Sequence, residues 1–153
     1  MLKNLDPLLN PNLLYILRAM GHGDVLTIVD SNFPADSVAS TTVHGEVIRL
    51  DGAGIPEVAN AIFSIFPLDS FVEAPIKYMQ VVGEPKTVLE VHKDLHNIAL
   101  ENADREWKMD SVERHNFYEQ SRKAYAVIAT AERRPYGCFM ITKGVIAPDG
   151  KVV

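Results

Sequence analysis

Two ionisable side chains flank a short apolar run near the start of the chain. His22 precedes the run, between Gly21 and Gly23, and Asp30 follows it. Histidine titrates near neutral pH and can exchange protons with a bound molecule, and flanking glycines let a ligand approach the backbone closely. In open α/β sheets, ligands bind beyond the carboxyl ends of the strands, which is where Asp30 falls. The alternatives are a histidine that only follows the end of a helix and an aspartate that only begins a turn.

The run between these two residues, VLTIV at 25–29, predicts a strand that is covered on both faces. A strand rises about 3.3 Å per residue, so His22 and Asp30 would be roughly 20 Å apart if both belonged to it. For both to serve one pocket, His22 must project back from its loop, or a neighbouring subunit must intervene.

A second group of polar side chains lies in the last third of the chain. Arg114, Tyr118 and Arg122 recur every four residues, so a helix would place them on one face. That face is either a solvated stripe, which we expect for Arg122, or part of a sugar site, where arginine donates hydrogen bonds and tyrosine supplies a flat ring. Tyr136 lies in a loop before the last predicted strand and is either a core residue or a ring that stacks on a ligand.

His92 and His96 are also four residues apart, a spacing that suits two zinc ligands on a helix. No third ligand is evident in the sequence. We therefore expect an exposed helix face here and no metal site.

Composition narrows the classes of protein that the chain can belong to. It has 153 residues, a net charge of −5 and no run of Lys or Arg, which argues against nucleic acid or an anionic membrane as a partner. Cys138 is the lone cysteine, so an internal disulfide and a cysteine-based zinc site are excluded, which fits a reducing cytoplasm. The first 17 residues are too broken by polar residues and proline for a signal peptide. The longest apolar runs are far too short for a membrane span.

The hydrophobic pattern alternates between strands and helices. This pattern predicts an α/β fold with a parallel or mixed sheet in one domain, residues 1–153, with a tail that is loosely ordered from about residue 147. No glycine-rich phosphate loop and no G-x-S-x-G motif is present, so no nucleotide cofactor is expected. We expect strands over 25–29, 47–50, 77–82, 124–130, 138–143 and the end of 105–112, helices over 11–20, 55–66, 86–102 and 113–123, and a loop over 31–45.

Several short motifs occur in the chain in a characteristic order. They are LLYILRAMGHGD, DSNFPA, VIRLDG, LDS, FYEQSRKAYAVIATAE, YG and KGV. Together they cover the stretch from about Leu5 to Val145, and no single motif is decisive. In order and spacing the chain resembles the L-fucose mutarotase and D-ribose pyranase family.

The resemblance implies a cofactor-free enzyme that interconverts ring forms or anomers of a free monosaccharide. It implies a Rossmann-like three-layer fold, with a mainly parallel sheet flanked by helices, and a ring-shaped homo-oligomer, often a decamer. His22 falls on the family's proton-donating histidine, and Asp30 and Arg114 fall on substrate-binding positions. Tyr136 and Cys138 fall on a substrate-binding Tyr-x-Asn element that crosses a subunit boundary in the family. We add Tyr118 as a substrate-binding residue because it shares a helix face with Arg114.

Two features favour the fucose branch: GHGD is followed by FPA, and Arg114 stands where ribose pyranases carry histidine. Three features depart from the family pattern, and one of them is the poor match of the long helix and its exit, up to Trp107. Cys138 replaces the usual asparagine, and the insertion TTVHGE at 41–46 lengthens a loop. We expect a mutarotase for L-fucose, with His22 as the acid and base. The alternatives are D-ribose pyranase activity, a non-catalytic sugar-binding or regulatory protein, and a metal-dependent isomerase that uses His92 and His96 and is inhibited by a chelator.

Overall fold

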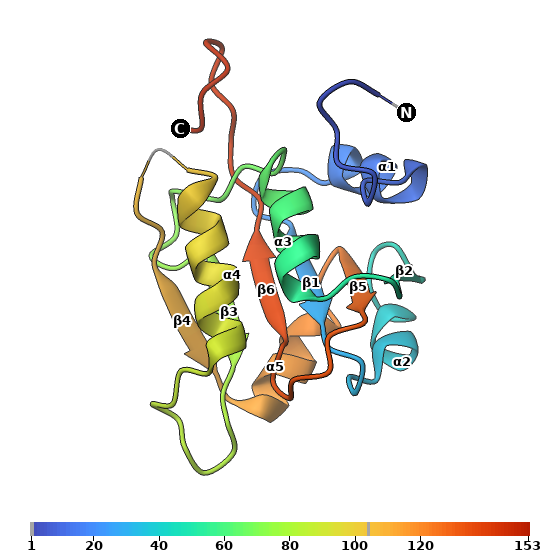
Figure 1. The fold of residues 1–153 in the computed structure, drawn as a ribbon, viewed down its shortest axis with the longest axis vertical. Helices are drawn as coiled ribbons and strands as arrows, with labels where there is room; N and C mark the ends of the chain where they lie inside the picture. Colours follow the sequence, from blue (N-terminus) through green and yellow to red (C-terminus); the bar gives the residue numbers. More distant parts are fainter. Residues whose placement is uncertain (1, 104) are drawn as a thin grey trace.

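A six-stranded sheet runs through the middle of the computed structural model, which describes residues 2–103 and 105–153. The strands follow the order β2-β5-β1-β6-β3-β4 across the sheet. β1 is parallel to β5 and β5 is parallel to β2, whereas β6 is antiparallel to both β1 and β3 (Figure 1). The predicted α/β class with a mainly parallel sheet is therefore confirmed. The strands are β1 (Val25–Val29), β2 (Val47–Leu50), β3 (Ile76–Met79), β4 (Met109–Val112), β5 (Ala126–Thr130) and β6 (Phe139–Thr142).

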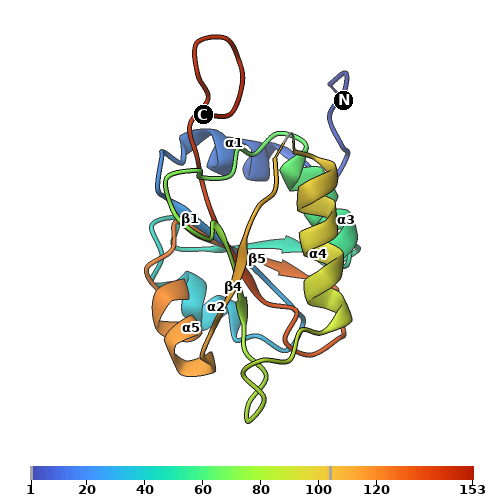
Figure 2. The ribbon, with the colours of Figure 1, turned by 90° about the vertical axis from the view of Figure 1, so that its left-hand side faces the viewer.

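Helices cover both faces of this sheet. Figure 2 shows the sheet between two layers, with α3 and α4 on one side and α2 and α5 on the other, as the three-layer prediction requires. α1 begins at Pro11 because the side chain of Asn10 accepts a hydrogen bond from the backbone N–H of Leu13 at 2.9 Å. The helices are α1 (Pro11–Ala19), α2 (Ala35–Ala39), α3 (Ile55–Phe63), α4 (Glu90–Glu101) and α5 (Arg114–Ser121).

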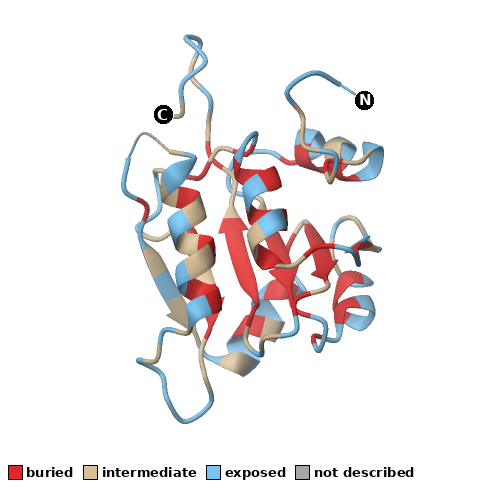
Figure 3. Ribbon diagram, viewed as in Figure 1, coloured by how far each residue is buried: buried red, intermediate tan, exposed pale blue. Residues whose placement is uncertain are grey.

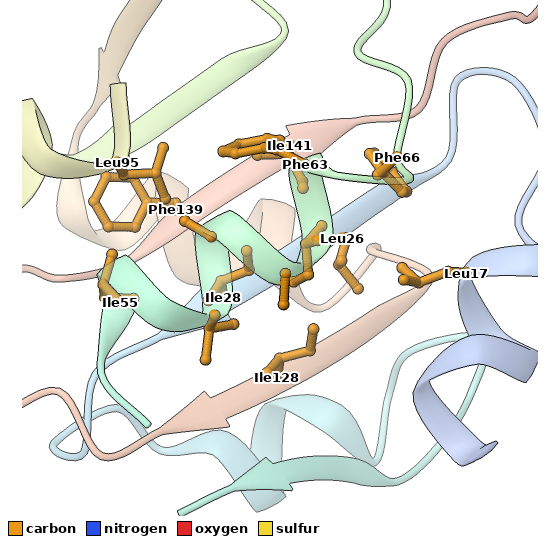
Figure 4. Packing of buried hydrophobic residues seen from close by; sticks show 14 of the residues in the cluster. Leu17, Leu26, Ile28, Ile55, Phe63, Phe66, Leu95, Ile128, Phe139 and Ile141 are labelled. Carbon is orange, nitrogen blue, oxygen red and sulfur yellow. The ribbon is translucent and has the colours of Figure 1, made fainter. Parts of the chain in front are cut away.

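Two apolar clusters fix these layers to the sheet. The larger cluster joins α1, α3 and α4 to one sheet face and includes Leu17, Leu26 and Phe139 (Figure 4). The smaller cluster joins α2 and α5 to the other face and is centred on the fully buried Phe117. The central strands are buried, whereas the edge strand β4 is only partly so (Figure 3). Burial on both faces explains why the central strands read as nearly continuous apolar runs.

Several predicted elements differ from those in the structure. The strand expected over 77–82 ends at Met79, and the helix expected over 55–66 ends at Phe63. Residues 31–45 were expected to form a loop but contain the short helix α2, whose Ala35, Val38 and Ala39 are buried. Three small apolar side chains within a polar stretch gave too weak a periodic signal to reveal it. The helix expected from residue 86 begins at Glu90 instead, because 83–88 forms a turn and extended chain after β3.

The end of the chain folds back on itself beyond β6. The backbone N–H of Ala147 donates to the carbonyl of Lys151, and Val152 packs against the larger cluster. No helix in the part of the chain that the structure describes is both long and apolar enough to cross a membrane.

Among the glycines, Gly144 is the one at which an added Cβ would lie closest to the backbone of another segment of the chain. Its N–H donates to the carbonyl of Pro67 at 2.8 Å, and a Cβ placed on it would overlap the backbone of Leu68. We expect Gly144→Ala to lower the free energy of unfolding by about 1–3 kcal/mol, as overpacking does elsewhere. Gly52→Ala is the matched control, because a Cβ there meets open space, and it should change stability by less than about 0.5 kcal/mol. Urea denaturation of both variants would measure this, and equal stabilities would contradict the prediction.

Candidate active site

A cavity of about 300 Å³, lined by both polar and apolar side chains, opens beyond the carboxyl end of β1. Its volume lies at the lower end of the range for ligand pockets, about 300–1,000 Å³, which suits a ligand as small as one sugar ring. Side chains from the turn after β1, from β3, from α5 and from the loop before β6 meet in it. The residues that line it are Asp30, Asn32, Phe33, Met79, Arg114, Tyr118, Pro135, Tyr136 and Cys138.

Asp30 is the anionic group of this cavity and is held firmly. Its Oδ1 accepts the backbone N–H of Asn32 at 2.9 Å, and its Oδ2 lies 3.4 Å from the Sγ of Cys138. Burial first, and then the charge of Asp30, raises the pKa of Cys138 well above its usual value, so the thiol stays protonated and donates. A carboxylate accepts about four hydrogen bonds. Asn32 and Cys138 use only two of these positions, so the buried carboxylate of Asp30 keeps acceptor capacity for a ligand in the cavity.

Arg114 supplies the positive charge on the opposite side, at the first residue of α5. Glu113 caps this helix, since its carboxylate accepts the backbone N–H groups of His115 and Asn116 at 2.9 and 3.1 Å. These two hydrogen bonds lower the pKa of Glu113. Within the described residues, the Nε of Arg114 is buried and has no hydrogen-bond partner. A buried donor without a partner is costly, so this N–H is available for a ligand.

Two tyrosine rings complete the wall. Tyr118 lies one helical turn after Arg114, and its ring is 5.3 Å from that of Phe33. Burial first, and then the neighbouring Cys138, raises its pKa, so its hydroxyl remains a donor. Tyr136 has a φ of +62°, in the left-handed region, where a residue with a Cβ is strained by about 1–2 kcal/mol. Its hydroxyl accepts the backbone N–H of Val82 at 3.4 Å.

Charged side chains fix the loop that carries Tyr136. Arg134 donates to both carboxylate oxygens of Glu132, at 3.0 and 2.8 Å, and to Asp94 of α4 at 2.7 Å. The hydrogen bonds from Arg134 lower the pKa of Glu132 to about 2, so its charge persists over the physiological range. Gly137 lets the loop pack closely, because a Cβ there would lie 3.0 Å from Glu132.

His92 and His96 do not form the exposed face that their spacing suggested. His92 is fully buried; its Nε2 donates to the carbonyl of Tyr136 at 3.0 Å, and its Nδ1 accepts the backbone N–H of Leu89 at 3.2 Å. The Nε2 of His96 lies 2.6 Å from the carbonyl of Trp107. Among the described residues, no group of three or more His, Cys, Asp or Glu side chains could hold a metal ion. The prediction of an exposed pair was wrong for His92, because its carbonyl partner is 44 positions away in the sequence.

His22 lies at the other end of β1 from the cavity, as the strand geometry predicted. Its Nε2 is 3.0 Å from the Oδ1 of Asp69, which also accepts the backbone N–H of Phe71 at 3.0 Å. Asp69 is almost completely buried, whereas the His22 side chain is 47% exposed. Gly23 has a φ of +84°, so this glycine is required by the turn. Asp69 therefore presents His22 to the outside of the subunit.

The chain thus brings together five of the six predicted site residues and leaves His22 apart. Asp30, Arg114, Tyr118, Tyr136 and Cys138 line one cavity of one chain. The family resemblance implies a subunit boundary at the Tyr136–Cys138 segment, and within one chain this segment lines the same cavity as Asp30. Sequence reasoning missed Asn32, Phe33, Met79 and Pro135. Asn32 and Phe33 were within reach, since they directly follow Asp30 in the same turn.

A second hollow of about 330 Å³ lies between the carboxyl ends of α3 and α4 and the terminal segment. Apolar side chains such as Phe66 and Trp107 dominate its lining, and Lys151 is the charged residue among them. Within the described parts of the chain, its lining has no acidic residue beside Lys151. The cavity at the carboxyl end of β1 is therefore the better candidate for an active site.

Burial lowers the pKa of His92 and outweighs the opposing effect of its bond to Tyr136. In the unfolded chain histidine titrates near 6.5, so the folded state favours the neutral ring. The contribution of the neutral His92 ring to the free energy of unfolding is therefore complete above about pH 6.5, and it is lost as the pH falls below this value. We expect the free energy of unfolding to drop between pH 7.5 and 5, and to drop less in His92→Gln. His96→Gln is the control, measured over the same pH range. If the free energy of unfolding fell equally steeply with pH in wild type and in His92→Gln, His92 would not be the group responsible.

Comparison with known proteins agrees with this fold. Residues 3–146 match the model of the RbsD / FucU transport protein family, and the chain belongs to that family. It is 43% identical over 150 residues to a fucose mutarotase of Danio rerio, with 97% of this chain and 96% of the relative covered. It is 40% identical over 146 residues to an L-fucose mutarotase of Actinobacillus pleuropneumoniae, with 95% and 97% covered.

A solved structure is also similar to this chain over most of its length. The fucose mutarotase of Streptococcus pneumoniae, crystallised in complex with L-fucose, is 34% identical and superposes with a TM-score of 0.85. The alignment covers 95% of this chain and 100% of that one.

Proposed function

We propose that this protein is a mutarotase that interconverts the α and β anomers of free L-fucose by general acid–base catalysis, without a metal or another cofactor. One observation carries the proposal. In a chain 40–43% identical to curated fucose mutarotases, a carboxylate, an unpaired arginine Nε and two tyrosine rings line one cavity of monosaccharide size.

The reaction needs two proton transfers and no other reagent. The anomeric hydroxyl loses a proton while the ring oxygen gains one, and the C–O bond between the anomeric carbon and the ring oxygen breaks to give the open-chain aldehyde. The sugar hydroxyl then adds to the other face of the aldehyde, and the protons move in the opposite sense. General acid–base groups accelerate such a step by about 10²–10⁴-fold each.

The cavity residues have complementary parts in this reaction. Asp30 accepts hydrogen bonds from sugar hydroxyl groups, and Arg114 donates to sugar oxygens through its free Nε. The rings of Tyr118 and Tyr136 pack against the apolar edge of the sugar, and their hydroxyls remain available for hydrogen bonds. Cys138 acts mainly through Asp30, because a thiol is a weak donor and its Sγ already faces the carboxylate.

The acid and base in this proposal is His22 of a neighbouring subunit. His22 is half-exposed and lies at the opposite end of β1 from its own cavity. It therefore reaches a cavity only if a second copy of the chain presents it there. This requires a homo-oligomer. We propose a ring-shaped assembly, most simply a decamer, in which every subunit makes the same contact with its neighbour.

Two further points belong to the proposal. Arg114 favours L-fucose over D-ribose because its five fixed donors contact sugar oxygens that a neutral histidine cannot serve in the same way. A cytoplasmic location fits the free, buried thiol of Cys138.

Purified protein treated with EDTA should accelerate the exchange between α- and β-L-fucose, because the proposed steps use side chains alone. Saturation-transfer NMR measures this exchange directly, with D-ribose and buffer alone in parallel. We expect L-fucose to exchange faster than D-ribose in the presence of protein. Sugar binding without faster exchange of any sugar would favour a non-catalytic binding protein, and loss of the exchange with EDTA would contradict the cofactor-free mechanism.

A further inference from the structure

His92 is a buried histidine whose hydrogen bonds define its role. Its Nδ1 accepts an N–H from Leu89 and its Nε2 faces a carbonyl oxygen, which can only accept, so the ring is the neutral Nε2–H tautomer. The imidazole is packed 4.2 Å from the ring of Tyr78 and edge-on to Phe139 at 5.8 Å. It has no freedom to turn away from the carbonyl that it serves.

That carbonyl belongs to Tyr136, the residue whose backbone is strained. A φ of +62° is unusual for a residue with a Cβ, and such conformations persist only where the surroundings over-determine them. The Tyr136 ring lines the cavity, and its hydroxyl accepts the N–H of Val82. The bond from His92 is thus a direct link between the start of α4 and the orientation of the Tyr136 ring.

We propose that His92 is a positioning residue of the sugar site, which holds the Tyr136 carbonyl and thereby keeps the Tyr136 ring against the cavity. The inference rests on the proposed function, since the sugar is the ligand that the ring would contact. His92 itself does not line the cavity, so it acts only through Tyr136. His96, one turn further along the helix, donates from its Nε2 to the carbonyl of Trp107 instead and serves as an internal comparison.

The two hydrogen bonds of His92 can be separated by substitution. Asparagine places an oxygen at the position of Nδ1, so His92→Asn keeps an acceptor for Leu89 and loses the donor to Tyr136. Glutamine reaches as far as Nε2, so His92→Gln keeps a donor for Tyr136 and loses the acceptor for Leu89. A residue that only stabilises the fold would respond to both changes in proportion to the stability lost.

The experiment measures KM and kcat for α/β exchange of L-fucose by NMR in the wild type, both His92 variants and His96→Asn. Circular dichroism, thermal unfolding and light scattering report fold, stability and assembly in each sample. His92→Asn should raise KM by roughly tenfold, the value of about one hydrogen bond, with a smaller change in kcat. His92→Gln and His96→Asn should stay within about twofold of wild type. In a Tyr136→Ala background, His92→Asn should have no further effect on KM.

Each other outcome would overturn the inference. If KM rises equally in both His92 variants, or follows the loss of thermal stability, His92 is structural only. If His92→Asn still raises KM in the Tyr136→Ala background, it does not act through Tyr136. Should His92→Asn fail to fold, His92→Gln decides, because a folded glutamine variant with a tenfold higher KM contradicts the proposal. A wild-type protein that neither binds nor exchanges a sugar would refute the proposed function, and the inference with it.

Discussion

The direction of β1 is the constraint on which the rest of the site depends. The strand begins next to His22 and ends at Asp30, and its five residues are locked between β5 and β6 by parallel and antiparallel pairing. Burial of Leu26, Ile28 and Val29 leaves no freedom for the strand to shift. An extended strand cannot fold back on itself, so the histidine and the aspartate lie at the two opposite ends of β1. In this account, catalysis by both requires two copies of the chain.

The two ends of β1 are built differently, in keeping with these separate roles. At the carboxyl end, α5 and the loop before β6 line an open cavity in which Asp30 and the Nε of Arg114 are buried. At the amino end, the buried carboxylate of Asp69 holds a histidine that remains half-exposed. Burial strengthens hydrogen bonds to a ligand, and in the proposed mechanism the exposure of His22 would let it enter the cavity of a neighbouring copy.

Much of this arrangement could be predicted from local sequence. Apolar runs revealed β1 and β2 with their observed bounds, since strands buried on both faces carry continuous apolar residues. Asp30 was a candidate because it ends such a strand, and Arg114 and Tyr118 because a helix places them on one face. What could not be predicted depends on contacts between distant segments. His92 touches Tyr136 across 44 positions and His22 touches Asp69 across 47, and no local pattern encodes such pairings.

Subunit complementation tests the shared site most directly. His22→Asn removes the acid and base, so this variant alone should exchange L-fucose at least about 10²-fold more slowly than wild type. Asp30→Asn removes the carboxylate that binds the sugar, so this variant alone should also be slower than wild type. Oligomers assembled from an equal mixture contain some sites that combine an intact cavity with an intact histidine from the neighbour. Random mixing should therefore restore about a quarter of the wild-type exchange rate. Mixed oligomers that remain as inactive as the separate variants would contradict a site built from two subunits.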